Sequence, residues 1–181
     1  LMDVASSTNF PMDARANTDV RNKEDKSSSV KNVDYTDYEE DIFVGYRYFD
    51  SFGKQVSYPF GYGLSYSDFT YEKIESVKQD KKNIRVTVSV KNTSGRDGEE
   101  VVQLYASYPD SKVERPSKQL RAFRRIPIKA GETRKVTLTV PKEELGYWNE
   151  GKQMFVVEPG TVKLLIGASS EDIRLEGKIR L

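Results

Sequence analysis

Hydrophobic residues in the second half of the chain recur at every other position, which is the pattern of a β-strand with one buried face. In residues 84–90, isoleucine and valine occupy the even positions and polar residues stand between them. Residues 136–140 and 162–166 repeat this alternation, whereas residues 101–108 are apolar on both faces, which indicates a central strand. Much of a shared core is therefore expected from nine aliphatic residues: Val86, Val88, Val90, Val136, Leu138, Val140, Val162, Leu164 and Ile166.

Turn-forming residues separate these segments at the short intervals that are typical of a β-sandwich. We predict that residues 119–128 pair with residues 133–140, and that residues 153–157 pair with residues 161–168 across a Pro-Gly turn. One helical turn is expected at residues 141–145, which begin with proline. The predicted fold class is all-β, with about seven strands arranged as a sandwich.

Aromatic side chains are expected to complete this core. Ordering about 110 residues costs more free energy than nine buried aliphatic side chains supply. Phe123, Trp148 and Phe155 are therefore predicted to join the core.

The first part of the chain lacks such regular alternation. Residues 13–33 contain few apolar side chains, and their charged and serine-rich run is typical of a solvated loop. Residues 42–49 are dense in β-branched and aromatic residues, which predicts a strand. Residues 58–69 read Tyr-Pro-Phe-Gly-Tyr-Gly-Leu-Ser-Tyr-Ser-Asp-Phe, so these twelve positions contain two glycines, one proline and five aromatic rings. This composition predicts a rigid, bent connector whose rings wedge between neighbours.

Composition excludes several classes of function. A net charge of +1 gives no electrostatic reason to expect nucleic acid or an anionic membrane as a partner. No apolar run approaches the roughly 20 residues that span a bilayer. The chain contains no cysteine and no histidine, which excludes disulfides, thiol nucleophiles, serine–histidine triads and most transition-metal sites.

Several motifs together resemble one enzyme family, the family 3 glycoside hydrolases. The connector resembles the end of that family's second domain, and residues 42–50 match the segment before it. Further motifs resemble the family's C-terminal fibronectin type III-like domain, in the family's order: residues 101–105, Arg115-Pro116, residues 119–123 and residues 156–160. Residues 1–4 and 9–11 resemble the stretch after the family's α/β sandwich, while residues 13–32 carry no family motif.

The resemblance implies a division of the chain and a parent enzyme. Residues 1–68 would be the tail of an α/β sandwich domain plus the connector, forming an extended N-terminal strap. Residues 69–181 would be an immunoglobulin-like or fibronectin type III-like sandwich. The parent would remove terminal β-linked sugars from oligosaccharides or glycosides, with retention, through two carboxylates. Its catalytic barrel and α/β sandwich would be the partners, and bacterial relatives are commonly periplasmic or secreted.

The resemblance also implies that the catalytic residues lie outside this chain, and it implies no cofactor and no metal. The expected role of the strap is therefore to anchor the sandwich to the preceding domains. The side chains expected to do so are aromatic or cationic: Tyr46, Arg47, Tyr48, Phe60, Tyr62 and Tyr66. A less favoured interpretation lets Tyr46, Arg47, Tyr48 and Asp50 reach a substrate pocket, because aromatic rings stack on sugars.

Other candidate sites have simpler structural interpretations. Ser67-Asp68-Phe69 looks like the family's nucleophile motif but follows the connector, where a small polar pair enters the first strand. The acidic clusters at residues 39–41, 99–100 and 143–144 are expected to be solvated surface, since neighbours on a strand point to opposite faces. The basic patch of Lys118, Arg121, Arg124 and Arg125 is interpreted as the solvent-exposed face of a strand rather than as a docking surface. Asn92-Thr93-Ser94 fits the glycosylation pattern but is interpreted as a turn.

Two other functions remain open from the sequence. A carbohydrate-binding module needs an exposed row of rings, for which the candidates are Tyr105, Tyr108, Tyr147 and Trp148. An adhesion-type sandwich unrelated to hydrolysis is the third possibility. The connector argues against it, because such modules usually join through short plain linkers.

Overall fold

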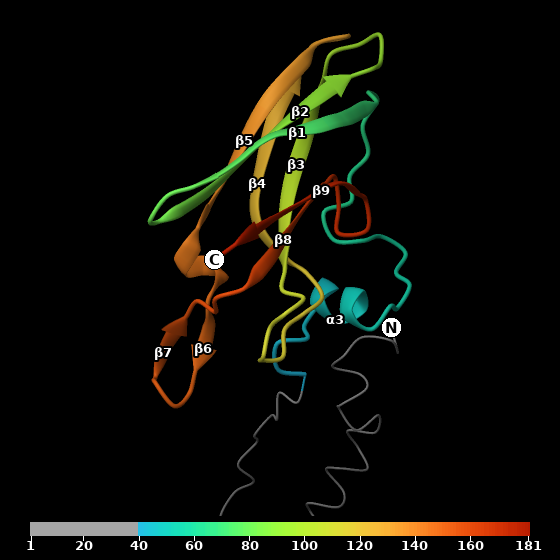
Figure 1. Cartoon of the computed structure of the whole chain (residues 1–181). Coiled ribbons are helices and arrows are strands. Elements are labelled where there is room, and N and C mark those ends of the chain that lie inside the picture. Colours follow the sequence, from blue (N-terminus) through green and yellow to red (C-terminus); the bar gives the residue numbers. More distant parts are fainter. Residues whose placement is uncertain (1–39) are drawn as a thin grey trace, which may run out of the picture.

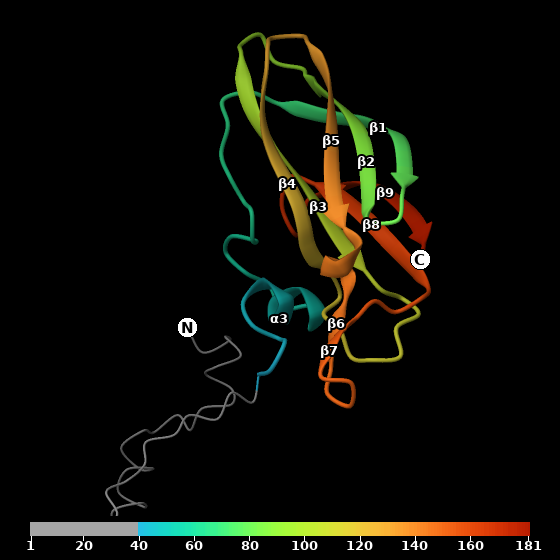
Figure 2. The same ribbon diagram turned by 90° about the vertical axis from the view of Figure 1, so that its left-hand side faces the viewer.

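Two antiparallel sheets pack face to face in the computed structural model, which describes residues 40–181 (Figures 1 and 2). The first sheet has the order β1-β2-β5, and the second has the order β4-β3-β8-β9. The strands of the first sheet are β1 (Phe69–Gln79), β2 (Asn83–Asn92) and β5 (Thr133–Pro141); those of the second are β3 (Gly98–Ser107), β4 (Gln119–Ile128), β8 (Thr161–Gly167) and β9 (Ile173–Arg180). The predicted all-β sandwich of about seven strands is confirmed.

The alternating aliphatic residues form the core between the sheets, as predicted. All nine have at most 1 % of their surface exposed. Strand β3 lies between β4 and β8, so the prediction of a central strand at residues 101–108 is also confirmed. Leu104 and Ala106 of β3 face this core, so the second sheet packs against the aliphatic face of β2 in the first sheet.

Strands β4 and β5 do not pair with each other, so the predicted hairpin of residues 119–128 and 133–140 is wrong. Strand β4 pairs with β3, and β5 pairs with β2 in the opposite sheet. The turn between them contains Gly131, whose φ of 73° takes the chain across from one sheet to the other. Ile126 and Val136 are thereby both directed into the core, a result that alternation alone does not distinguish from a hairpin.

A small separate hairpin replaces the second predicted pairing. Strand β6 (Tyr147–Asn149) pairs with β7 (Met154–Val156), whereas β8 pairs with β3 and β9, so the predicted pairing of residues 153–157 with residues 161–168 is wrong. The predicted helical turn is confirmed as a 3₁₀-helix, η1 (Lys142–Leu145).

The three aromatic residues predicted to join the core lie outside it. Phe123 and Phe155 are each 67 % exposed, and Trp148 is 49 % exposed. Phe123 points away from the core on the edge strand β4, and the other two belong to the β6–β7 hairpin. The core is instead completed by other residues, including Tyr71 of β1, Ile128 of β4 and Leu145 of η1.

The segment predicted as a strand at residues 42–49 contains a turn and the short helix α3 (Tyr46–Ser51). Gly45 precedes the helix with a φ of 60°, which an extended strand cannot contain. Aromatic density was the reason for predicting a strand, but here the rings pack against neighbours in three dimensions rather than across a sheet. The prediction is therefore wrong, and α3 lies at one end of the sandwich (Figures 1 and 2). Over residues 40–181, no helix is long and apolar enough to cross a membrane.

Candidate docking site

The connector between α3 and β1 is fixed along one side to the sandwich. The backbone N–H of Ser170 donates to the carbonyl of Phe60 at 2.8 Å, and that of Thr93 donates to the carbonyl of Asp68 at 2.8 Å. The hydroxyl of Ser67 is buried and donates to the carbonyls of Arg96 and Asp97. These contacts hold both ends of residues 60–68, so the connector is an ordered part of the domain surface.

Gly61 and Gln103 form the tightest part of this attachment. Gly61 has a φ of 82°, and a Cβ placed there would lie 2.3 Å from Oε1 of Gln103. The Nε2 of Gln103 donates to the carbonyls of Gly61 and Ala168, while its Oε1 accepts from the Tyr105 hydroxyl at 2.5 Å. Gln103 is 3 % exposed, so its amide needs these partners. Glycine at position 61 lets the connector approach closely enough to supply one of them.

Two of the six predicted anchoring residues pack on their own sandwich. The rings of Tyr46 and Phe60 stack with centroids 4.3 Å apart, and Tyr46 also meets Tyr105 edge to face at 6.2 Å. The Tyr46 hydroxyl accepts a hydrogen bond from the N–H of Leu120 at 2.9 Å. These contacts join α3 and the connector to β3 and β4.

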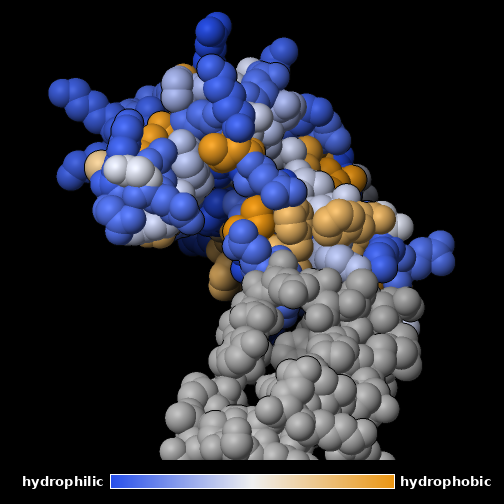
Figure 3. Space-filling model, turned by 90° about the horizontal axis from the view of Figure 1, so that it is seen from below, coloured by the Kyte–Doolittle hydropathy of each residue, from blue (hydrophilic) through white to orange (hydrophobic). Residues whose placement is uncertain are grey.

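Two others, Tyr62 and Tyr66, are presented to the outside. Tyr66 is 91 % exposed, Tyr62 is 49 % exposed, and Leu64 between them is 88 % exposed. Tyr58 adds a further ring 5.3 Å from that of Tyr62. Large exposed side chains that follow one another along a fixed connector are typical of an interaction site. Figure 3 views the α3 end of the molecule and shows apolar patches among hydrophilic side chains.

The last two predicted anchors lie on α3. The Tyr48 ring packs against Phe52 with centroids 5.0 Å apart, and Lys54 lies over its face. Within residues 40–181, the Arg47 side chain forms no hydrogen bond or ion pair. Asp50, considered above for substrate contact, is instead buried in an ion pair with Lys118 at 3.2 Å, its side chain 3 % exposed.

A cavity of about 560 Å³ lies between the connector and the second sheet. Its wall contains several carboxylates, including Glu100 and Asp172, and the cation Arg174, which binds Asp172 and donates to the carbonyl of Phe69. Burial raises the pKa of Glu100 above its ordinary value. Within residues 40–181, no group of three or more potential metal-ligating side chains is placed to hold an ion.

The candidate catalytic motifs have structural roles. Glu99 pairs with Arg125 whereas Glu100 faces Tyr71, so these neighbours point to opposite faces as expected. Residue 39 lies outside the described residues, and Glu143 and Glu144 belong to η1. The Ser67 hydroxyl is used in its hydrogen bonds to the carbonyls of Arg96 and Asp97. Glu99, Glu143 and Glu144 are exposed, as expected of solvated surface, whereas Glu100 is only partly exposed.

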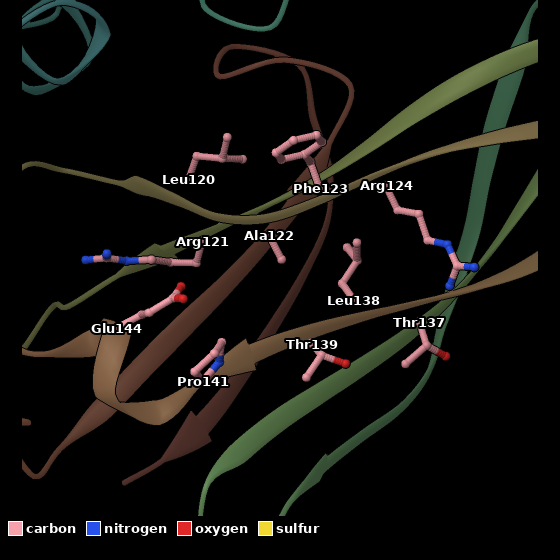
Figure 4. Close-up of a pocket in the computed structure, with 10 residues that line it drawn as sticks. All are labelled: Leu120, Arg121, Ala122, Phe123, Arg124, Thr137, Leu138, Thr139, Pro141 and Glu144. Carbon is pink, nitrogen blue, oxygen red and sulfur yellow. The ribbon is translucent and has the colours of Figure 1, made fainter.

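The basic patch is largely occupied by internal contacts. Lys118 pairs with Asp50, Arg125 pairs with Glu99, and Arg121 donates to Gln119. Beside it, a groove of about 460 Å³ follows the seam between the edge strands β4 and β5. Figure 4 shows aliphatic side chains in the middle of this groove and charged ones towards its ends.

The four rings considered for carbohydrate binding do not form a row. Tyr105 is fully buried, and Tyr108 and Tyr147 lie against the guanidinium of Arg115. Only Trp148 among the four is strongly exposed. The turn at Asn92 likewise has a structural explanation, since its buried amide donates to the carbonyls of Arg96 and Ile128.

Sequence reasoning missed two residues that organise this end of the molecule, Gln103 and Arg115. Both lie in motifs that carry the family resemblance, and this was the one feature of the sequence that could have pointed to them. Their partners, however, come from segments far apart in the sequence, so no spacing reveals them.

Comparison with known proteins places the chain in a family. The fibronectin type III-like domain family matches residues 100–170. The thermostable β-glucosidase B of Acetivibrio thermocellus is 41 % identical over 151 residues, which cover 82 % of this chain and 20 % of that protein.

Solved structures agree. β-Glucosidase 3B of Thermotoga neapolitana superposes with a TM-score of 0.74 at 42 % identity, covering 79 % of this chain and 20 % of that one. The family 3 β-glucosidase of Bifidobacterium adolescentis superposes with a TM-score of 0.76 at 39 % identity, covering 80 % of this chain and 22 % of that one. The chain thus spans about a fifth of the length of these relatives. It belongs to glycoside hydrolase family 3, and it corresponds to the C-terminal fibronectin type III-like region together with the connector before it.

Proposed function

We propose that this chain is the non-catalytic accessory region of a β-glucosidase-type enzyme that removes terminal β-linked sugars from oligosaccharides or glycosides. Its role is structural: it covers and stiffens a catalytic barrel and an α/β sandwich in the same polypeptide. The observation that carries the proposal is the connector, which is bonded to the sandwich on one side and exposes apolar side chains on the other.

The exposed side of the connector is suited to a protein surface. Tyr62, Leu64 and Tyr66 are held in place by the neighbouring contacts of Gly61 and Ser67, so docking them costs little additional conformational entropy. Aromatic anchors in preordered positions are typical of the energetic centre of an interface. Tyr46 and Phe60 serve in this scheme as internal supports, while Arg47 and Tyr48 extend the anchoring surface along α3.

We further infer a domain boundary between residues 68 and 69. The sandwich begins with β1 at Phe69, and the contacts of Ser67 and Asp68 close the connector against it. In this division, residues 1–68 belong to the α/β sandwich and connector, and residues 69–181 belong to the accessory domain.

A hydrolysis assay tests the catalytic half of the proposal. The purified 181-residue chain and the protein made from its complete reading frame are each supplied with an aryl β-glucoside and an aryl β-xyloside. We expect turnover of at least one substrate by the complete protein and none by the chain. Turnover by the chain, with contaminating enzyme excluded by a parallel mock purification, would overturn the proposal, as would a complete protein that cleaves no glycoside.

A further inference from the structure

The β6–β7 hairpin projects from the end of the sandwich at which α3 also lies (Figures 1 and 2). Trp148 and Phe155 are direct cross-strand partners, so their side chains share one face of the hairpin. Their rings meet edge to face, with centroids 5.4 Å apart and planes at 72°. Both rings are largely exposed, so this pair forms an apolar projection with no covering element in the part of the chain that the structure describes.

The opposite face of the hairpin is fixed by Arg115. Its guanidinium lies 4.1 Å from the ring centroid of Tyr108 and 5.3 Å from that of Tyr147, the first residue of β6. Its Nη1 donates to the carbonyl of Leu145 at 3.2 Å, and Glu158 supplies a carboxylate 3.8 Å from Nη2. The Arg115 side chain is only 6 % exposed, so it is a buried support rather than a surface charge.

The tip of the hairpin is ordered by its own hydrogen bonds. The N–H of Lys152 donates to the side-chain oxygen of Asn149 at 2.9 Å, and Gln153 donates from Nε2 to the carbonyl of Glu150. Asn149 in turn donates from Nδ2 to the Tyr147 hydroxyl. A three-residue pair of strands is marginal on its own, so these contacts and Arg115 account for its definite shape.

One loop connects the hairpin physically with α3. The loop at residues 108–118 contacts the hairpin base through Arg115, and its Ser111 hydroxyl donates to Glu158. At its other end, the N–H of Ser117 donates to the hydroxyl of Ser51 in α3 at 2.9 Å. Hairpin, loop and α3 therefore form one continuous, preordered end of the molecule, from which the connector runs along the side of the sandwich to β1 (Figures 1 and 2).

We propose that the β6–β7 hairpin is a second docking element, which inserts the Trp148–Phe155 pair into the surface of the catalytic part of the same polypeptide. This inference rests on the proposed function. The occupant is assigned from three observations: the relatives are about four times as long as this chain, the described chain begins at the α3 end, and the hairpin is continuous with that end.

The ring geometry favours protein over sugar as the occupant. A sugar face stacks on a flat ring surface, whereas two rings at 72° to each other present a ridge. A ridge of two rings fits a pocket between protein side chains, which is the usual environment of an aromatic interface anchor.

Site-specific photo-cross-linking in the protein made from the complete reading frame tests this inference. The photoreactive residue p-benzoylphenylalanine replaces Phe155 in one variant, and Phe123 in a matched control. Both positions are 67 % exposed in this chain, but Phe123 lies on β4 away from the hairpin. We expect cross-links from position 155 to residues that precede Leu1, and none from position 123. A third variant with the photoreactive residue at Tyr66 reports on the connector.

Each outcome has a distinct meaning. Cross-links from positions 66 and 155, but not 123, support the inference. Cross-links from position 66 without any from 155 overturn the inference and leave the proposed function standing, whereas none from either position overturns both. Cross-links from 155 only to a second copy or only within this chain also overturn it. Retention of the chain on insoluble polysaccharide that is lost in Trp148→Ser would assign the ridge to sugar instead.

Discussion

Substituting alanine for Gly61 tests whether the connector is truly part of the sandwich. A Cβ at this position would lie 2.3 Å from Oε1 and 2.6 Å from Nε2 of Gln103, and the backbone φ of 82° disfavours any side chain. The left-handed conformation costs roughly 1–2 kcal/mol for a non-glycine residue. Moving the Gln103 amide breaks up to three hydrogen bonds, each worth about 1 kcal/mol, so Gly61→Ala is expected to cost about 2–4 kcal/mol in the free energy of unfolding.

Gly63 provides the matched control two residues away. A Cβ there meets nothing within 4 Å and the backbone angle is ordinary, so Gly63→Ala should be neutral or slightly stabilising, within about 1 kcal/mol. Urea unfolding followed by circular dichroism measures both. With a slope of about 2 kcal/mol per molar urea, the midpoint for Gly61→Ala should fall by about 1–2 M.

A double substitution separates steric conflict from other causes. If Gly61→Ala acts by displacing the Gln103 amide, then adding Gln103→Ala removes the conflict, and the two losses should sum to more than the loss in the double variant. Equal midpoints for Gly61→Ala and Gly63→Ala would refute the reasoning. Strict additivity with Gln103→Ala would refute the proposed cause.

Three further perturbations test other supports of the fold. Asn92→Ala removes the amide that donates to the carbonyl of Ile128, so it should lower the free energy of unfolding by about 1–3 kcal/mol, measured by urea unfolding. A loss below about 0.5 kcal/mol, which is typical of a surface substitution, would contradict this role. Arg115→Ala should cost about 3–5 kcal/mol, against about 0.5 kcal/mol or less for Arg124→Ala, and equal losses would remove Arg115 as a support. Burial raises the folded-state pKa of Glu100 above 4.5, so the wild type loses stability as the pH rises from 4.5 through the raised value. Glu100→Gln cannot titrate, so the difference in unfolding free energy between the variant and the wild type should grow over this pH range. A difference that is independent of pH would contradict the raised pKa of Glu100.

Much of the sandwich could be predicted because its core depends on local alternation. Val86 to Val90, and Leu138 with its neighbours, alternate for the same reason that they are buried: one face of each strand meets the other sheet. Alternation does not say which strand lies beside which. Residues on either side of Gly131 show the pattern of a hairpin, yet they belong to different sheets, because a turn of similar length can also cross between layers.

Aromatic residues were the least predictable from the sequence. Residues 42–49 have the composition of a strand, but the positive φ of Gly45 and the stacking of Tyr46 on Phe60 set the local structure. Trp148 and Phe155 have the composition of a core and lie at the surface. In both cases the deciding contacts are tertiary. For exposed rings we propose that the deciding partner is a surface outside residues 40–181.

Among the anchoring residues, the sequence located the connector but not the direction of each ring. Glycine, proline and aromatic residues at positions 58–69 predicted a rigid bend, and the contacts of Gly61 and Ser67 agree with that prediction. Whether a ring faces its own domain or a neighbour depends on the register of the bend against Gln103 and Ser170. That register is set by partners more than forty residues away.

The most direct test of the account is the solvent exposure of Tyr66 in two proteins. Hydroxyl-radical footprinting with mass spectrometry is applied to the 181-residue chain and to the protein made from the complete reading frame. Tyr66 is 91 % exposed in this chain and should be labelled much more slowly in the complete protein, while the buried Tyr71 should stay slow in both. Equal labelling of Tyr66 in the two proteins would contradict the claim that the connector docks onto the preceding domains.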